Sequence, residues 1–287
     1  MFTRRRFVAS AALLPLTSAA FAGDNPEGLI EAIEKGAGGR LGVSALDTQT
    51  GKRIAWRGGE RFAMCSTFKV LAVGALLAKV DRGEDKLDRF VPYTKAEVSG
   101  FYAPVTQAHA GEGGMKLADL AAAAIMWSDN GGANLILKSL GGPQAVTAFV
   151  RTLGDTVTRL DRMEPFLNSS ISGDPRDTTS PDAMLGSFQK LVLGDALSAA
   201  SRELLTGWLK NCQTAKARIP AGLPKGWTSG NKTGTGSNGS TNDVAIIWPV
   251  ARKPIFLSVY FTGSTIADAA REAVIADVAR VVCATIF

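Results

Sequence analysis

The sequence is poor in the side chains that bind transition metals. Its 287 residues contain one histidine, His109, and three cysteines, and no two of these cysteines have the spacing of metal ligands. A zinc hydrolase needs three or four such ligands close together, so we expect no metal and no other cofactor. We interpret His109 as a polar residue of a loop or of the surface. The cysteines are Cys65, Cys212 and Cys283, an odd number that cannot all pair with one another.

Two common enzyme patterns are also missing. No serine has a glycine two positions before it and two positions after it, which argues against a Ser-His-Asp hydrolase of the G-x-S-x-G type. Residues 234–239 have the glycine spacing of a dinucleotide-binding loop. An apolar strand follows at residues 244–248, where that site requires a helix, so we expect a hairpin turn instead.

Nucleic acid and membranes are poor candidates for partners. Aromatic residues make up 7% of the chain and are scattered, with no interleaving of basic and aromatic residues. The net charge is +6, and Arg4, Arg5 and Arg6 contribute three of these charges, which leaves +3 (6 − 3) for the rest. No apolar run is long enough to span a membrane.

The first 22 residues have the pattern of a signal peptide. Three arginines precede an apolar run at residues 7–14, and Ala20 and Ala22 fit the small-x-small cleavage site. The arginines also resemble a twin-arginine signal, which exports folded proteins, and a general secretory signal is the alternative. We therefore expect a soluble protein, periplasmic or secreted, that leaves the membrane once the signal is cleaved.

Strands are predicted near both ends of the chain, with helices between them. The expected fold is α/β (α+β) with two lobes, in which helices from both termini flank an antiparallel sheet and the middle of the chain forms an all-helical lobe. We place the α/β lobe at residues 23–63 and 211–287 and the helical lobe at residues 64–210. The individual predictions are helices at residues 26–35 and 267–286, strands at 41–47, 53–57, 243–248 and 255–262, and mainly helices at 66–210.

A serine and a lysine three residues apart begin the most informative helix. Ser66 and Lys69 have the pattern S-x-x-K, which also occurs at residues 187–190 and 229–232 and is therefore weak alone. Only Ser66 is followed by a long apolar helix, at residues 70–80. A serine at a helix N-terminus lies where free N–H groups favour negative charge, and Lys69 would share its helix face.

Three further motifs add chemistry in a fixed order. Residues 128–130 read Ser-Asp-Asn, residues 162–168 read Arg-Met-Glu-Pro-Phe-Leu-Asn, and residues 232–234 read Lys-Thr-Gly. Together they supply a second hydroxyl, a carboxylate base and an anion-binding lysine. This is the equipment for forming an acyl-enzyme and then hydrolysing it.

The ordered set resembles that of the class A β-lactamases, over nearly the whole chain after the signal. The resemblance implies a monomeric enzyme that hydrolyses small-molecule β-lactams and so gives antibiotic resistance. Ser66 would be the nucleophile, Lys69 or Glu164 its base, and Ser128 the proton donor to the leaving nitrogen. Glu164 would activate the deacylating water, with Asn168 orienting it.

The same resemblance implies a set of substrate contacts. Asn130 would bind the side-chain amide of the substrate and Tyr102 would form a wall of the cleft. Lys232, Thr233 and Gly234 would form the carboxylate site, and Thr235 would share the oxyanion hole with Ser66. An Ω-loop, residues 159–177, would be closed by an ion pair between Arg162 and Asp177.

At two positions this sequence differs from some members of the family. Thr241 stands where many members have an arginine, and Arg218, fourteen residues before Lys232, has the spacing of an alternative carboxylate-binding arginine. Gly236 stands where some relatives have a cysteine paired with the one equivalent to Cys65, so that disulfide is not expected.

Two other functions share the three motifs. A peptidoglycan DD-peptidase or transpeptidase would lack the pair formed by Glu164 and Asn168. A penicillin-binding sensor that stays acylated would also lack Glu164 and would carry a membrane segment. The presence of both residues favours the hydrolase.

Overall fold

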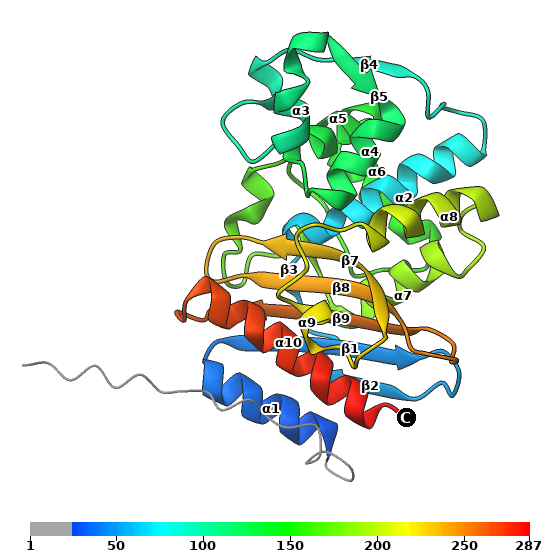
Figure 1. The fold of residues 1–287 in the computed structure, drawn as a ribbon. Helices are drawn as coiled ribbons and strands as arrows, with labels where there is room; N and C mark the ends of the chain where they lie inside the picture. Colours follow the sequence, from blue (N-terminus) through cyan, green and yellow to red (C-terminus); the bar gives the residue numbers. More distant parts are fainter. Residues whose placement is uncertain (1–24) are drawn as a thin grey trace, which may run out of the picture.

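The computed structural model describes residues 25–287, which form a sheet with helices on both faces and a helical lobe stacked above it (Figure 1). The predicted signal peptide lies outside these residues. Within residues 25–287 no helix combines the length and the apolar composition needed to cross a bilayer.

Strands from both ends of the chain build one antiparallel sheet in the order β2-β1-β9-β8-β7. The first long strand pairs with the last one along its whole length, which joins the two ends of the chain in one sheet. Most positions on β1, β8 and β9 are buried, as expected for a sheet that is covered on both faces. The strands are β1 (Arg40–Asp47), β2 (Arg53–Trp56), β7 (Thr228–Thr235), β8 (Thr241–Trp248) and β9 (Ile255–Thr262).

Two terminal helices cover one face of the sheet, the one turned toward the viewer in Figure 1. They are α1 (Pro26–Ala37) and α10 (Asp268–Thr285), and their apolar sides share one core with the sheet. The other face packs on α7 (Pro181–Val192), where the rings of Phe188 and Phe256 meet edge to face at 5.7 Å. The sheet therefore contributes to two separate apolar cores.

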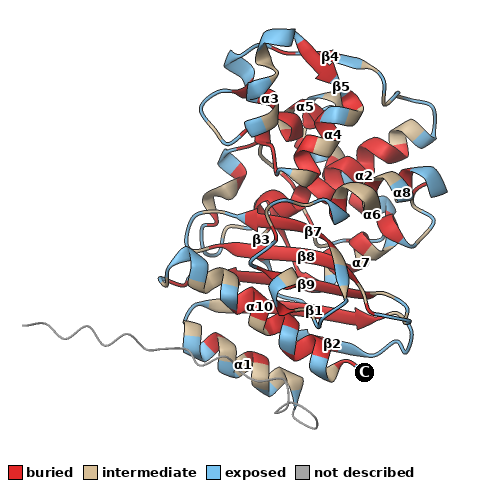
Figure 2. Ribbon diagram, in the orientation of Figure 1, coloured by how far each residue is buried: buried red, intermediate tan, exposed pale blue. Residues whose placement is uncertain are grey.

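The centre of the helical lobe is α2 (Phe68–Asp81). Its residues are buried from Phe68 to Ala78, which Figure 2 shows as a nearly continuous red helix. A side chain at Gly74 would begin 2.7 Å from Leu191 of α7, so the glycine permits close helix packing. The surrounding helices are α4 (Leu117–Met126), α5 (Asn130–Leu140), α6 (Pro143–Thr152), α7 and α8 (Ala199–Lys210).

Short elements complete the lobe and frame the region between the two cores. They are β3 (Phe62–Ala63), η1 (Cys65–Thr67), β4 (Phe90–Pro92), η2 (Ala96–Val98), α3 (Pro104–Ala108), η3 (Ala110–Glu112), β5 (Gly114–Lys116), η4 (Phe166–Ser169), β6 (Thr178–Thr179) and α9 (Ile219–Gly222).

The expected fold class is confirmed, and the predicted strands and terminal helices are present with ends shifted by one or two residues. The expected hairpin turn connects β7 and β8. One long strand, β7, had no prediction, because its sequence Thr-Ser-Gly-Asn-Lys-Thr-Gly-Thr contains no large apolar residue. It is nevertheless buried from Gly230 to Gly234, because it lies between β8 and the helical lobe.

Candidate active site

Ser66 lies at the junction between two helical segments. It is in the 3-10 turn η1, and α2 begins at Phe68. Ser66 lines a cavity with 8% of its surface exposed, whereas Lys69, in the first turn of α2, is fully buried. The turn is entered through Cys65, whose φ of 46° is uncommon for a residue with a side chain. The sequence thus places the hydroxyl at a helix N-terminus with the lysine just inside.

Two glycines let the segment around the end of β7 approach this turn. A Cβ atom on Gly234 would lie 2.7 Å from the carbonyl oxygen of Met64. One on Gly236 would lie 2.6 Å from Cys65 Sγ and 2.8 Å from the carbonyl oxygen of Asn168. Larger residues at these two positions would push the strand away from the turn that carries Ser66. The Cys65 thiol is free, and burial raises its pKa to about 12, so it is an inert buried group at neutral pH.

The amino group of Lys69 is held by several acceptors. Nζ donates to Asn130 Oδ1 at 2.6 Å and to the carbonyl oxygen of Ser128 at 2.7 Å, and it lies 3.1 Å from Glu164 Oε1. Burial lowers the pKa of Lys69, although the negative charge of Glu164 opposes that shift. A buried lysine with a lowered pKa is suited to accept and return a proton.

Ser128 lies between the two lysines. Lys232 Nζ donates to Ser128 Oγ at 2.9 Å, and Lys69 Nζ lies 3.5 Å from the same oxygen. Lys232 is fully buried, and burial together with the charge of Lys69 lowers its pKa to about 7. The backbone of Ser128 has a φ of 58°, a conformation that surrounding contacts must maintain.

Asp129 supplies those contacts and also caps α5, so Ser128 is not itself the helix cap. Its Oδ1 accepts from the N–H of Gly132 and from the hydroxyl of Thr106, both at 2.8 Å. Its Oδ2 accepts from the N–H groups of Val105 and Thr106. The N–H of Asn130 donates to the carbonyl oxygen of Tyr102 at 3.0 Å. The Ser-Asp-Asn segment is therefore tied to the loop that carries Tyr102.

Glu164 faces Ser66 from the Ω-loop. Its Oε1 accepts from Ser66 Oγ at 3.2 Å, and its Oε2 accepts from Asn168 Nδ2 at 2.5 Å. A residue not singled out from the sequence holds its backbone. Asn134 on α5 accepts from the N–H of Glu164 and donates to its carbonyl oxygen, both at 3.0 Å. Its position one turn after Asn130, on the same face of α5, is the signal that could have identified it.

An ion pair closes the base of this loop. Arg162 Nε donates to Asp177 Oδ2 at 2.5 Å, and the other carboxylate oxygen accepts from the N–H groups of Asp161 and Arg162. Asp161 in turn accepts from the N–H of Asp177 at 3.0 Å. Asp177 is fully buried, so the loop depends on a charge that has no water to solvate it.

These groups line a cavity of about 440 Å³ between the sheet and the helical lobe. Ser66 and Ser128 line it, whereas Lys69, Lys232 and Glu164 are buried behind the lining residues. Tyr102 is 56% exposed at the rim. The lining residues are Ser66, Tyr102, Ser128, Asn130, Asn168, Thr214, Arg218, Thr233, Thr235 and Glu272.

Arg218 reaches the cavity, although it precedes Lys232 by fourteen residues. Its Nη1 donates to the carbonyl oxygens of Gly234 and Asn242, and its Nη2 donates to Thr235 Oγ1 at 2.8 Å. Its Nε donates to Glu272 on α10 at 3.1 Å. The side chain therefore holds strands β7 and β8 by hydrogen bonds and also lines the cavity.

Neither Glu272 nor Thr214 was singled out from the sequence. Thr214 shares a hydrogen bond with Thr233 at 2.5 Å. Thr241 pairs with Thr235 across the hairpin, is buried, and is not among the residues that line the cavity. His109 lies outside this site, and its ring hydrogen-bonds to Glu112. No cluster of three or more metal-binding side chains occurs in the described part of the chain.

Comparisons with known proteins show which family the chain is similar to. The sequence model of the "Beta-lactamase enzyme family" matches residues 26–286. A β-lactamase of Proteus vulgaris is 49% identical over 233 residues, which are 81% of this chain and 85% of the relative. β-Lactamase Toho-1 of Escherichia coli is 46% identical over 253 residues, covering 88% and 86%. The structure of an ancestral class A β-lactamase superposes with a TM-score of 0.88 at 54% identity, covering 90% and 98%.

Proposed function

The chain belongs to the β-lactamase enzyme family as a class A member, and from that premise we propose how its residues hydrolyse a β-lactam. The enzyme is a β-lactam hydrolase that works through a serine acyl-enzyme, an activity that confers antibiotic resistance. The observation that carries the proposed roles is one carboxylate oxygen, Glu164 Oε1, which contacts both Ser66 Oγ and Lys69 Nζ.

We assign acylation to Ser66 and the groups around it. The hydroxyl attacks the lactam carbonyl. Glu164, which contacts the hydroxyl directly, can accept its proton, and Lys69 contacts the same carboxylate oxygen of Glu164. The N–H groups of Ser66 and Thr235 bind the developing oxyanion, a type of contact worth about 10²–10³ in rate. Ser128, held between two amino groups, passes a proton to the leaving nitrogen.

We assign deacylation to the pair on the Ω-loop. Glu164 removes a proton from the attacking water and Asn168 orients it. Asn168 Oδ1 is buried and accepts no hydrogen bond within residues 25–287, whereas its Nδ2 is fixed on Glu164. A DD-peptidase or a penicillin sensor would not need this pair, so its presence supports hydrolysis over both alternatives.

Substrate recognition is proposed for the walls of the 440 Å³ cavity. Thr233, Gly234 and Thr235 present the strand edge to the substrate carboxylate, with the charges of Lys232 and Arg218 behind them. Asn130 and Tyr102 bind the acylamino side of the substrate. The planar guanidinium of Arg218 matches a carboxylate and stays charged at every working pH.

We propose the domain organisation and the cellular localisation that the sequence predicts. Residues 1–22 would be removed on export, by the twin-arginine route, to leave a monomeric periplasmic or secreted enzyme. Residues 23–63 and 211–287 would form the α/β lobe, and residues 64–210 would form the helical lobe with the Ω-loop at 159–177.

The purified mature protein tests the proposal directly. It should hydrolyse a penicillin and a chromogenic cephalosporin without added metal, and Ser66→Ala should abolish turnover, because Ser66 carries the hydroxyl that contacts the Glu164 carboxylate. Undiminished activity of Ser66→Ala, or loss of the parent's activity with a chelator, would refute the serine mechanism.

A further inference from the structure

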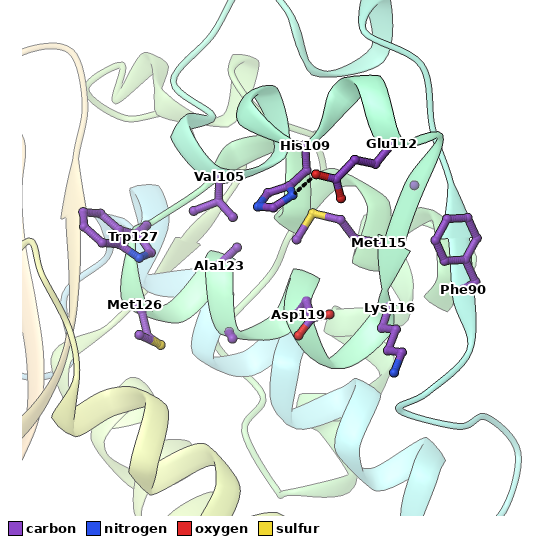
Figure 3. Close-up of a pocket in the computed structure, with 12 residues that line it drawn as sticks. Phe90, Val105, His109, Glu112, Met115, Lys116, Asp119, Ala123, Met126 and Trp127 are labelled. Atoms are coloured by element: carbon purple, nitrogen blue, oxygen red, sulfur yellow. Dashed lines mark hydrogen bonds and ion pairs between the residues drawn. The ribbon is translucent and has the colours of Figure 1, made fainter.

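A second cavity, of about 600 Å³, lies in the helical lobe, separate from the residues that line the cleft. Figure 3 shows it as a groove that runs from Trp127 at one end to Phe90 at the other. His109 and Glu112 lie on one side of the groove, and Asp119 and Ala123 lie on the opposite side. The walls come from β4, α3, η3, β5 and α4 and the residue that follows α4.

The groove combines apolar ends with acidic sides. Trp127 and Phe90 are 41% and 55% exposed, which is high for large apolar side chains, and Met115 and Met126 add adaptable apolar surface. Within residues 25–287, Asp119 forms no ion pair, and the Glu112 carboxylate pairs only with the ring of His109.

Only one lysine faces these two carboxylates. Lys116 lines the groove, and in Figure 3 its amino group points away from Glu112. A ligand suited to this lining therefore carries apolar groups, and a positive charge near its middle or at one end is attracted to the two carboxylates. Both carboxylates are exposed to water, with 64% of the Glu112 side chain accessible, so they favour a cation over a neutral molecule only modestly and repel anions.

We propose that this groove binds an elongated aromatic amine and that binding acts on Ser128. The ring of the amine would pack against Trp127 and Met126, and its ammonium group would lie between Asp119 and Glu112. Aromatic and methionine side chains with a few convergent charges are the usual lining of small-molecule sites.

Hydrogen bonds connect the groove to the Ser-Asp-Asn segment. The carbonyl oxygen of Ala123, a lining residue, accepts from the N–H groups of Trp127 and Asp129 at 3.1 and 3.2 Å. Val105, also a lining residue, donates its N–H to Asp129 Oδ2 at 2.8 Å. Ser128 lies between Trp127 and Asp129 with its φ of 58°. A ligand that displaces Trp127 or Val105 therefore acts on both neighbours of the serine.

The expected consequence rests on the proposed role of Ser128 as the proton donor of acylation. Moving its hydroxyl away from the leaving nitrogen slows acylation, whereas deacylation depends on Glu164 and should not change. Coupling between two sites typically changes the affected constant about fivefold or more. Saturating ligand should therefore lower kcat/KM for a penicillin by about that factor and leave the deacylation rate constant unaltered.

Calorimetry with 4-phenylbutylamine tests the site itself, and 4-phenylbutan-1-ol serves as the uncharged matched probe. Both are titrated into the mature enzyme and into Ser66→Ala, so binding is measured whether or not the enzyme turns over β-lactams. Ala122→Leu fills the groove from α4. Ala118→Leu is its control, because Ala118 lies on the same helix, is similarly half-buried and does not line the groove.

The amine should bind the parent and Ala118→Leu equally and bind Ala122→Leu at least about tenfold more weakly, since the added side chain occupies the ligand's volume. Asp119→Asn should weaken the amine about two- to fivefold, as expected for an exposed charge, and leave the alcohol unchanged. No binding of the amine, or equal binding to both leucine variants, overturns the site. The predicted binding pattern with an unchanged kcat/KM overturns the coupling to Ser128.

Discussion

Replacing Asp177 by asparagine should strongly destabilise the Ω-loop. The carboxylate is fully buried and accepts from Arg162 Nε and from two backbone N–H groups. Asparagine has the same shape, but it lacks the charge and presents an NH₂ group to donors. Breaking a fully buried pair costs about 3–5 kcal/mol. Arg162 keeps 21% of its side chain exposed, so we expect about 2–4 kcal/mol for Asp177→Asn.

Thermal denaturation and pre-steady-state kinetics measure the two consequences. For a chain of this size, each kcal/mol lowers Tm by about 2–4 °C, so Tm should fall by about 4–16 °C. Deacylation of small, poor substrates should slow most, because Glu164 is carried by this loop, while bulky cephalosporins gain entry. Arg162→Ser should give the same pattern.

Asp174→Asn is the matched control. Asp174 belongs to the same loop and pairs with Arg176, but Arg176 is half exposed and the contact joins near neighbours in sequence. Its loss should leave Tm and deacylation unchanged within error. Parental Tm and kinetics in Asp177→Asn, or an equal loss in Asp174→Asn, would refute the argument that the buried charge holds the loop.

Two further predictions concern the carboxylate site. Because the pKa of Lys232 is lowered to about 7, its ammonium form is lost as the pH rises through that value, so kcat/KM for penicillins should fall above about pH 7. In Lys232→Arg the charge is fixed, and a falling limb that persists there would assign the titration to another group. Arg218→Ala should raise KM for carboxylate-bearing substrates by about tens of fold, the equivalent of a charged hydrogen bond worth about 1.5–3 kcal/mol, and Thr241→Arg should partly restore it. Unchanged KM with a lowered Tm would mean that Arg218 only braces β7.

The sequence predicts the parts of the fold in which apolar residues repeat. Strands β8 and β9 and helix α2 are buried, and their sequences are correspondingly rich in apolar residues. Such apolar runs predict buried elements without knowledge of the fold. The sequence of strand β7 contains no such apolar run. Its buried positions are polar or glycine, because it presents Thr233 to the cleft, carries Lys232 beneath it and must approach η1 closely. An edge strand with polar residues and glycines at its buried positions lacks the apolar pattern by which strands are predicted from sequence.

The site follows the same division. Ser66, Lys69, Ser128 and Glu164 stand in short motifs, and the structure brings them within hydrogen-bonding reach of one another. Glu272 carries no local signal, because it meets Arg218 only after the C-terminal helix packs beside the sheet. Sequence motifs do not predict residues whose role depends only on a contact formed in the folded structure.

Intact-mass spectrometry of Glu164→Ala mixed with benzylpenicillin tests the central claim most directly. The claim is that Ser66 forms an acyl-enzyme that Glu164 resolves, and a general base contributes about 10²–10⁴ in rate. The variant should accumulate an adduct with the mass of the whole penicillin, and the double variant Ser66→Ala, Glu164→Ala should form none. Turnover by Glu164→Ala at the parental rate, or an adduct that persists when Ser66 is absent, would contradict the account.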